Sequence, residues 1–239
     1  MAAPIHWHGQ GGQDEIAWRT LGKKQGGYFV DLAANDPFQF SNTATLERTF
    51  GWKGLCIETL PKKVKALREK RSCQVVDAVV GTGAPVLFRQ FSTNASTAGH
   101  LRWIHGLSHT VKGPPLPGLT INHTCATGRS CYTTNQLRNV GVRVDEVYTP
   151  TVSLATLLEK HTAPRVIDYL SLDVEGAEDD VLLHFPFDKY LFRVMSIERP
   201  SNKLKRVLRA HGYSKLAGPL KASAWGEEMW LATTAKVLI

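Results

Sequence analysis

The chain has 239 residues, of which 43% are hydrophobic and 21% charged, and its 29 basic and 21 acidic residues give a formal net charge of +8. This composition excludes a wholly disordered chain and a collagen-like repeat, and no apolar run reaches the roughly 18–20 residues of a membrane-spanning helix. Met1–Gln13 is polar and glycine-rich with no apolar signal-peptide core, so we expect a soluble protein, either cytoplasmic or the lumenal domain of a longer precursor.

The first ninety or so residues alternate short apolar runs with amphipathic segments, which is typical of an α/β fold. After an N-terminal extension at 1–27, we expect strands at 28–30, 54–57, 74–80 and 86–88. Helices are expected over 43–50, where Ser41 or Asn42 is the N-cap, and over the basic segment 62–70.

Residues 92–149 interrupt this alternation of apolar runs and amphipathic segments. They are rich in Gly, Pro, Ser, Thr and Asn, and connections of this length are usually functional or disordered, so we expect an irregular insertion that acts as a substrate-binding loop or lid. The alternation then returns, with expected helices over 153–161, 178–184 and 202–211 and strands at 166–172, 192–197, 213–216 and 228–233. No internal repeat is present, and we expect residues 1–239 to form a single domain.

Four cysteines leave the redox compartment open. Cys56 and Cys73 lie in or beside apolar runs and are interpreted as small core residues. Cys125 and Cys131 lie in a polar stretch, and the sequence leaves open whether they form a disulfide. Glycosylation sequons begin at Asn94 and Asn122, although such tripeptides also arise by chance.

Four predicted strands end at or next to an acid, namely Asp31, Glu58, Asp173 or Glu198, and a fifth apolar run, at Val75-Val76, leads into Asp77. In open α/β sheets, ligands bind beyond the carboxyl ends of the strands, so these side chains should face one crevice. One such acid alone is more often a helix cap or a solvated loop residue. Five gathered together cost free energy unless a ligand, a metal or a cation offsets their charge.

The pattern around the first two strands favours a nucleoside ligand without phosphates. Glu58 ends the second strand, where an acid can accept hydrogen bonds from both ribose hydroxyls. The turn from Asp31 to Asp36 has small residues for close approach, but it lacks the glycine-rich pattern that binds a pyrophosphate, and Asp36 would repel one. S-Adenosylmethionine, a cationic nucleoside that carries no phosphate, fits these features.

Several segments resemble the FkbM-type methyltransferases, a branch of the class I S-adenosylmethionine-dependent methyltransferases. The similar segments are residues 27–36, 41–43, 46–47, 51–58, 167–178 and 196–198, and Gln13-Asp14 is similar to the family's entry motif. The chain departs from the family pattern at Ala33 and Pro37, where glycine is common. The resemblance implies a Rossmann-like fold, with a mostly parallel seven-stranded sheet, helices on both of its faces and a long loop insertion.

The resemblance also implies roles for the acids and their neighbours. The expected cofactor-binding residues are Asp31, Ala33 and Asn35 for the methionine part, Glu58 for the ribose, Asp77 and Ala78 for the adenine, and also Asp36, Asn42 and Asp173. Asp173 and Glu175 should lie at the methyl-transfer edge, whereas Glu178 is interpreted as a charge at a helix N-terminus.

Members of this family mostly methylate hydroxyls, often on sugars, so the resemblance implies a carbohydrate O-methyltransferase. A hydroxyl acceptor must lose its proton, which calls for a general base or a metal. Asp173 is the expected base or metal ligand, with Glu175 and Glu198 as catalytic neighbours, and Mg²⁺ is a second candidate cofactor there. The insertion adds Trp103 and Tyr132, which suit sugar binding, and four alternative bases, His100, His105, His109 and His123.

Two alternatives stay open. RNA ribose methylation would use the basic segments 62–71 and 203–209, which carry most of the excess positive charge. Because those helices should cover the faces of the sheet and not its reactive edge, a nucleic-acid partner is not expected. The other alternative is a catalytically inactive module that binds S-adenosylmethionine. The sequence predicts no oligomeric state.

Overall fold

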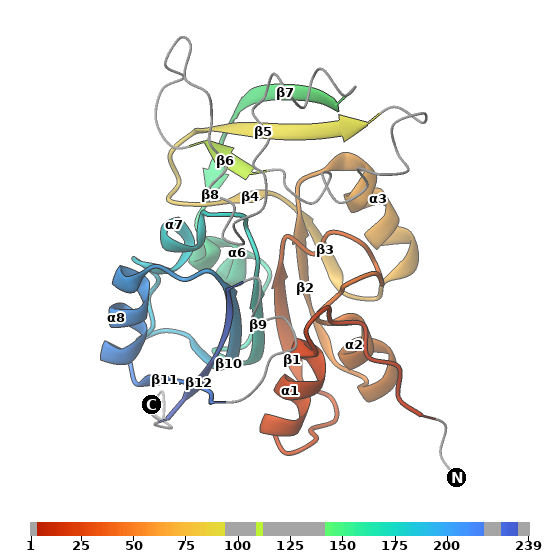
Figure 1. Ribbon diagram of the computed structural model, residues 1–239, viewed down its shortest axis with the longest axis vertical. Coiled ribbons are helices and arrows are strands. Elements are labelled where there is room, and N and C mark those ends of the chain that lie inside the picture. The colour runs from red at the N-terminus through yellow and green to blue at the C-terminus, as the bar shows by residue number, and fades with distance from the viewer. Residues whose placement is uncertain (1–3, 94–108, 112–141, 218–225, 234–239) are drawn as a thin grey trace.

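A seven-stranded sheet forms the centre of the computed structural model, which describes residues 4–93, 109–111, 142–217 and 226–233 (Figure 1). Its strand order is β11-β12-β10-β9-β1-β2-β3. The strands are β1 (Tyr28–Leu32), β2 (Lys53–Glu58), β3 (Gln74–Asp77), β9 (Val166–Leu172), β10 (Leu191–Glu198), β11 (Tyr213–Lys215) and β12 (Glu227–Ala232). Only β12 runs against its neighbours in this sheet, which confirms the predicted mostly parallel, Rossmann-like fold.

Helices cover both faces of this sheet (Figure 1). One face carries α1 (Gln13–Thr20), α2 (Ala44–Phe50) and α3 (Pro61–Lys70), and the other carries α6 (Leu154–Lys160), α7 (Glu178–Leu182) and α8 (Asn202–Ala210). Alternation along each strand decides which side chains meet which helices. In β1, Phe29 packs in the cluster with α1–α3, whereas Val30 and Leu32 pack in the cluster with α6–α8. The side chain of Asp31 therefore points to the α1–α3 side.

The structure differs from the prediction at three places in the N-terminal half. Helix α1 lies within the segment expected to be only an extension. The expected strand at 74–80 is divided at Ala78, because β4 (Val79–Val80) leaves the main sheet and pairs with β8 (Thr151–Val152). Asp31 lies inside β1 and does not follow it.

A second, three-stranded antiparallel sheet lies at the top of Figure 1. It contains β5 (Val86–Thr93), β6 (His109–Val111) and β7 (Val142–Thr149), in the order β6-β5-β7. Residues 142–149 were expected to be irregular, but they form a strand because all eight of them pair with β5, a partner that no local pattern identifies.

Several expectations fall outside the described residues. They concern Cys125 and Cys131, the two sequons, and the side chains of His100, Trp103, His105, His123 and Tyr132. His109 is in β6, but its side chain also lies outside the description. The proposed lid over the site stays a prediction.

Cys56 and Cys73 form a disulfide, which corrects their interpretation as separate core residues. Cys56 is in β2, and Cys73 directly precedes β3. Both are buried, as expected, but the parallel pairing of β2 and β3 also brings their sulfur atoms together. Within the described ranges, no helix has both the length and the apolar character needed to cross a membrane.

Candidate active site

A cleft of about 710 Å³, including its part open to solvent, lies beyond the carboxyl ends of β1, β2 and β9. The lining residues are Leu32, Ala33, Asn35, Ile57, Glu58, Thr59, Leu60, Ala78, Val79, Val80, Phe88, Asp173, Val174 and Ala177. Five of the predicted cofactor residues are among them, namely Ala33, Asn35, Glu58, Ala78 and Asp173.

The Glu58 carboxylate is held rigidly at the end of β2. One of its oxygens accepts hydrogen bonds from the backbone N–H groups of Thr59 and Leu60, at 2.8 and 2.9 Å, and the other accepts one from Asn35 N–H at 2.9 Å. Glu58 is buried, and its carbonyl oxygen accepts a further bond from Ala78 N–H at 3.2 Å. A carboxylate offers about four acceptor positions, so this one keeps capacity for a ligand hydroxyl.

The first turn of the cleft adopts a left-handed backbone. Ala33 has φ 58° and Asn35 has φ 53°. Glycine enters this region without steric cost, whereas a Cβ costs roughly 1–2 kcal/mol there. The family's frequent glycine at the position of Ala33 therefore has a conformational explanation, and this chain keeps the same conformation with alanine.

Asp31 and Asn42, two predicted cofactor residues, are not among the residues that line the cleft. Asp31 is buried and accepts a 2.6 Å hydrogen bond from the Thr43 hydroxyl. Burial raises the pKa of Asp31, while the Thr43 hydroxyl and the Arg71 guanidinium oppose that shift. The Asn42 amide donates to Ser171 Oγ at 3.2 Å, and its buried Oδ1 has no hydrogen-bond partner among the described residues. Asn42 Oδ1 is thus a spare acceptor near the end of β9.

Asp36 and Asp77 also lie outside the lining of the cleft. The Asp36 carboxylate accepts bonds from Phe38 N–H and Gln39 N–H at 3.0 and 2.9 Å. Although partial burial opposes it, these two bonds and the Lys63 ammonium hold the pKa of Asp36 below its usual value. Asp77 is exposed at the end of β3. The neighbouring Ala78 reaches the cleft, but the Asp77 side chain does not line it.

The three predicted catalytic acids come together beside the cleft. Oxygen atoms of Asp173, Glu175 and Glu198 lie within 4.8 Å of one another. Asp173 follows β9, and Glu198 ends β10, its parallel neighbour, so the shared sheet edge brings them close. Arg199 donates to Glu175 at 2.7 Å and to Glu198 at 2.5 Å.

Crowding of these acids changes their proton affinities. Desolvation, followed by the Glu198 and Glu175 carboxylates, raises the pKa of Asp173 well above its usual range. Asp173 is exposed to the cleft, so water reaches it and the two neighbouring carboxylates carry the greater weight. Burial and the Glu198 charge raise the pKa of Glu175 to about 7, although Arg199 opposes them. Glu175 is therefore the member of this cluster that exchanges its proton near neutral pH.

Glu227 extends this acidic group, and the sequence analysis did not identify it. It lies in β12 directly opposite Glu198, and the Gln13 side-chain amide of α1 donates to its carboxylate. Burial raises the pKa of Glu227 to about 7. Arg199 was also missed, although its place directly after Glu198 was a signal that could have found it. No local signal identifies Glu227, because the pairing of β10 with β12 is tertiary.

The acidic cluster is a poor fit for Mg²⁺ as it stands. Asp173, Glu175 and Glu198 offer the oxygen atoms that this ion prefers. However, the Arg199 guanidinium already bonds two of the three carboxylates, so a cation of the protein itself occupies that side of the cluster. Arg199 thus already offsets part of the negative charge that a metal ion would otherwise offset.

The structure agrees with the expected position of Glu178 at a helix start and with the expectation that the two basic helices cover the sheet with their charged side chains outward. Glu178 begins α7 and accepts a 3.1 Å bond from Gly176 N–H, which is a local role at a helix start. Each basic helix buries two leucine or valine side chains and exposes most of its lysines and arginines, with Val64 and Leu67 buried in α3 and Leu204 and Leu208 in α8.

Comparison with protein-family models matches residues 31–214 to the model described as Methyltransferase FkbM domain. The match runs from β1 into β11 and includes every described residue that lines the cleft. In a comparison with curated proteins, no match was found.

Proposed function

The chain belongs to the FkbM methyltransferase family, and we propose that it transfers a methyl group from S-adenosylmethionine to a hydroxyl group of a sugar or glycan. One observation carries the cofactor assignment. The lining of the cleft contains two carboxylates, those of Glu58 and Asp173, and none of the described lining residues is basic. Such a site favours a cationic ligand without phosphates and disfavours a dinucleotide.

The described residues fit this cofactor from end to end. Glu58 has a free acceptor position for a ribose hydroxyl, because its three backbone donors leave part of the carboxylate open. Val79, Val80 and Phe88 supply an apolar wall beyond Ala78, which suits an adenine ring. Ala33 and Asn35 present the left-handed turn to the remaining, methionine part.

The reaction needs a base at the far end of the cleft. When bound, S-adenosylmethionine supplies an electrophilic methyl group on a positively charged sulfur. Asp173 accepts the proton of the acceptor hydroxyl, and its carboxylate is a stronger base for having a raised pKa. Arg199 holds Glu175 and Glu198 in place on the other side. No step requires a metal.

The charge of the acceptor side supports a neutral acceptor over RNA. Four acids, Asp173, Glu175, Glu198 and Glu227, gather there, and Arg199 is already paired with Glu175 and Glu198, so the described part of this side is a poor surface for a polyphosphate chain. None of the described residues that line the cleft is a lysine or arginine of α3 or α8.

Calorimetry with S-adenosylmethionine tests the cofactor assignment directly. We expect saturable binding of S-adenosylmethionine and S-adenosylhomocysteine and no measurable binding of NAD. Absence of binding would remove both the enzyme and the inactive-module interpretations.

A panel of acceptors then tests the reaction. S-Adenosylhomocysteine should form in the presence of neutral glycosides and not with RNA oligonucleotides. A salt titration provides the control, because binding to RNA would weaken steeply with rising salt. Cofactor binding without turnover on any acceptor would favour the inactive module.

A further inference from the structure

A fully buried ion pair lies behind the first turn of the cleft. Arg71, which follows α3, has a side chain with no exposed surface, and its partner Glu47 in α2 is 4% exposed. The guanidinium donates through Nε and Nη2 to the two Glu47 oxygens, at 3.2 and 3.1 Å. Removing both charges from water costs free energy, so a pair of this kind is stable only when its other hydrogen bonds are also satisfied.

The remaining donors of Arg71 hold the segment that leads from the first turn into α2. Nη1 donates to the Pro37 carbonyl and to Ser41 Oγ, both at 3.1 Å, and Nη2 donates to Thr43 Oγ1 at 3.0 Å. Thr43 in turn donates its hydroxyl proton to Asp31 at 2.6 Å. A continuous chain of hydrogen bonds therefore joins Arg71 to the strand end from which the turn with Ala33 begins.

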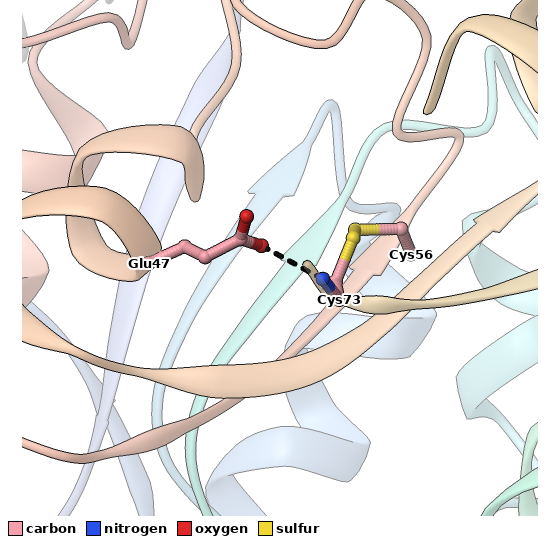
Figure 2. A group of neighbouring side chains, drawn as sticks. All are labelled: Glu47, Cys56 and Cys73. Carbon is pink, nitrogen blue, oxygen red and sulfur yellow. Dashed lines mark hydrogen bonds between the residues drawn. A yellow bond between two sulfur atoms is a disulfide. The ribbon is translucent and has the colours of Figure 1, made fainter. Parts of the chain in front are cut away.

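The disulfide fixes the other side of this arrangement. Glu47 also accepts bonds from the backbone N–H groups of Ser72 and Cys73, at 2.7 and 3.1 Å, and Figure 2 shows the Glu47 carboxylate bonded to the Cys73 nitrogen beside the disulfide. Cys56, the partner of Cys73, is two residues before Glu58 in β2. The ion pair is thus attached to the strand that carries the expected ribose-binding carboxylate.

We propose that Arg71 is a positioning residue for the cofactor, acting through Thr43 and Asp31 on the first turn, and that the Cys56–Cys73 disulfide holds Arg71 in register. The inference rests on the proposed function, because it takes residues 31–37 as the cofactor turn. Arginine is required because its planar group reaches four acceptor residues at once, which a lysine ammonium cannot do.

Arg71→Lys is the first test, since it keeps the positive charge and removes the planar guanidinium that donates to four residues. We expect the Kd for S-adenosylmethionine, measured by calorimetry, to rise about tenfold or more, the scale of losing hydrogen bonds to a charged group. Arg89→Lys is the matched control. Arg89 is the other buried arginine of the described residues, pairs with Glu146 in the small sheet and should leave the Kd unchanged.

Thr43 provides a second test that keeps the ion pair. Thr43→Val removes only the hydroxyl between Arg71 and Asp31 and should weaken cofactor binding several-fold, whereas Thr43→Ser should restore it. If Thr43 had only a structural role, Thr43→Val would lower the thermal midpoint of unfolding, and Thr43→Ser would not restore the affinity for the cofactor. If Arg71→Lys does not fold, the affinities of Thr43→Val and Thr43→Ser for the cofactor test the positioning role.

The disulfide is tested by the double variant Cys56→Ala, Cys73→Ala, which should also raise the Kd. Cofactor affinity equal to wild type in folded Arg71→Lys and in Thr43→Val would overturn the positioning role, and wild-type affinity in the double alanine variant would overturn the role of the disulfide. A wild-type protein that does not bind S-adenosylmethionine would instead refute the proposed function.

Discussion

Two groups of carboxylates stand at the same edge of the main sheet, and their surroundings differ sharply. Glu58 is a single carboxylate that accepts three backbone N–H bonds. Asp173, Glu175, Glu198 and Glu227 form a group of four acids with one guanidinium, that of Arg199, among them. Backbone hydrogen bonds satisfy most of the acceptor positions of Glu58, whereas the four acids of the second group lie close to one another.

Under the proposed function, this difference would separate cofactor binding, at Glu58, from the chemical step, at Asp173. A carboxylate that the backbone already holds can accept hydroxyl hydrogen bonds without moving or changing its charge, which suits recognition. In the other group, burial and neighbouring carboxylates raise the pKa of Asp173 well above its usual range and that of Glu175 to about 7, which suits a general base. Variants of Asp173 should therefore change turnover, and variants of Glu58 should change the affinity for the cofactor.

Asp173→Asn should give the largest effect. Loss of the general base is expected to lower the turnover of methyl transfer by about 100-fold to 10,000-fold, while S-adenosylmethionine binding changes far less. S-Adenosylhomocysteine formation and calorimetry measure the two quantities. Asp188→Asn, an exposed change away from the cleft, is the control and should be silent. Turnover like wild type in Asp173→Asn would refute the assignment.

Glu58→Gln should weaken binding and not the chemical step. The amide NH₂ of glutamine would face one or more of the backbone N–H donors that now bond the carboxylate, and the charge-assisted bonds to the ribose would be lost. We expect about 1.5–3 kcal/mol less favourable cofactor binding, measured by calorimetry. An unchanged Kd combined with lost turnover would reverse the roles of the two groups.

Glu227→Gln tests the raised pKa of Glu227 through stability. The pKa of Glu227 is raised to about 7, so the folded state binds this proton more tightly than the unfolded state does. Stability is therefore lost as pH rises from about 4.5 through about 7, and the substitution should remove that loss.

The expected gain from Glu227→Gln is on the order of 1 kcal/mol at about pH 8 and near zero at about pH 5. Thermal unfolding at the two pH values measures it. Glu69→Gln, on the exposed face of α3, is the control and should gain nothing at either pH. An equal gain from Glu227→Gln at both values would show that the raised pKa of Glu227 is not the cause.

Ala33→Gly should give the smallest effect. Glycine relieves the left-handed strain at φ 58°, but it also has more freedom to lose on folding. We expect a net change of no more than about 1 kcal/mol in the free energy of unfolding, towards stability, with cofactor affinity kept or improved. Denaturant unfolding with and without cofactor measures both, and a clear loss of stability would contradict the strain at this turn.

Local patterns in the sequence predicted most of the sheet and part of the site. Apolar alternation located the strands of the main sheet, and the acids at their ends predicted the carboxyl-edge cleft. The same reasoning failed for Asp31, whose side chain turns towards α2 and bonds Thr43. A strand end defines an edge, but the alternation of side chains decides which face each residue takes.

The sequence by itself determined the α/β order of the main sheet and the position of Glu58 at the end of its strand, because each depends on periodicity or composition within a few neighbouring residues. Only the tertiary structure decided that Cys56 bonds Cys73, that Arg71 reaches Thr43 and that Glu227 stands opposite Glu198. Each of these contacts joins segments that are separate in the chain. Their proximity follows from strand register and from helices packed across the sheet, and no local pattern encodes either.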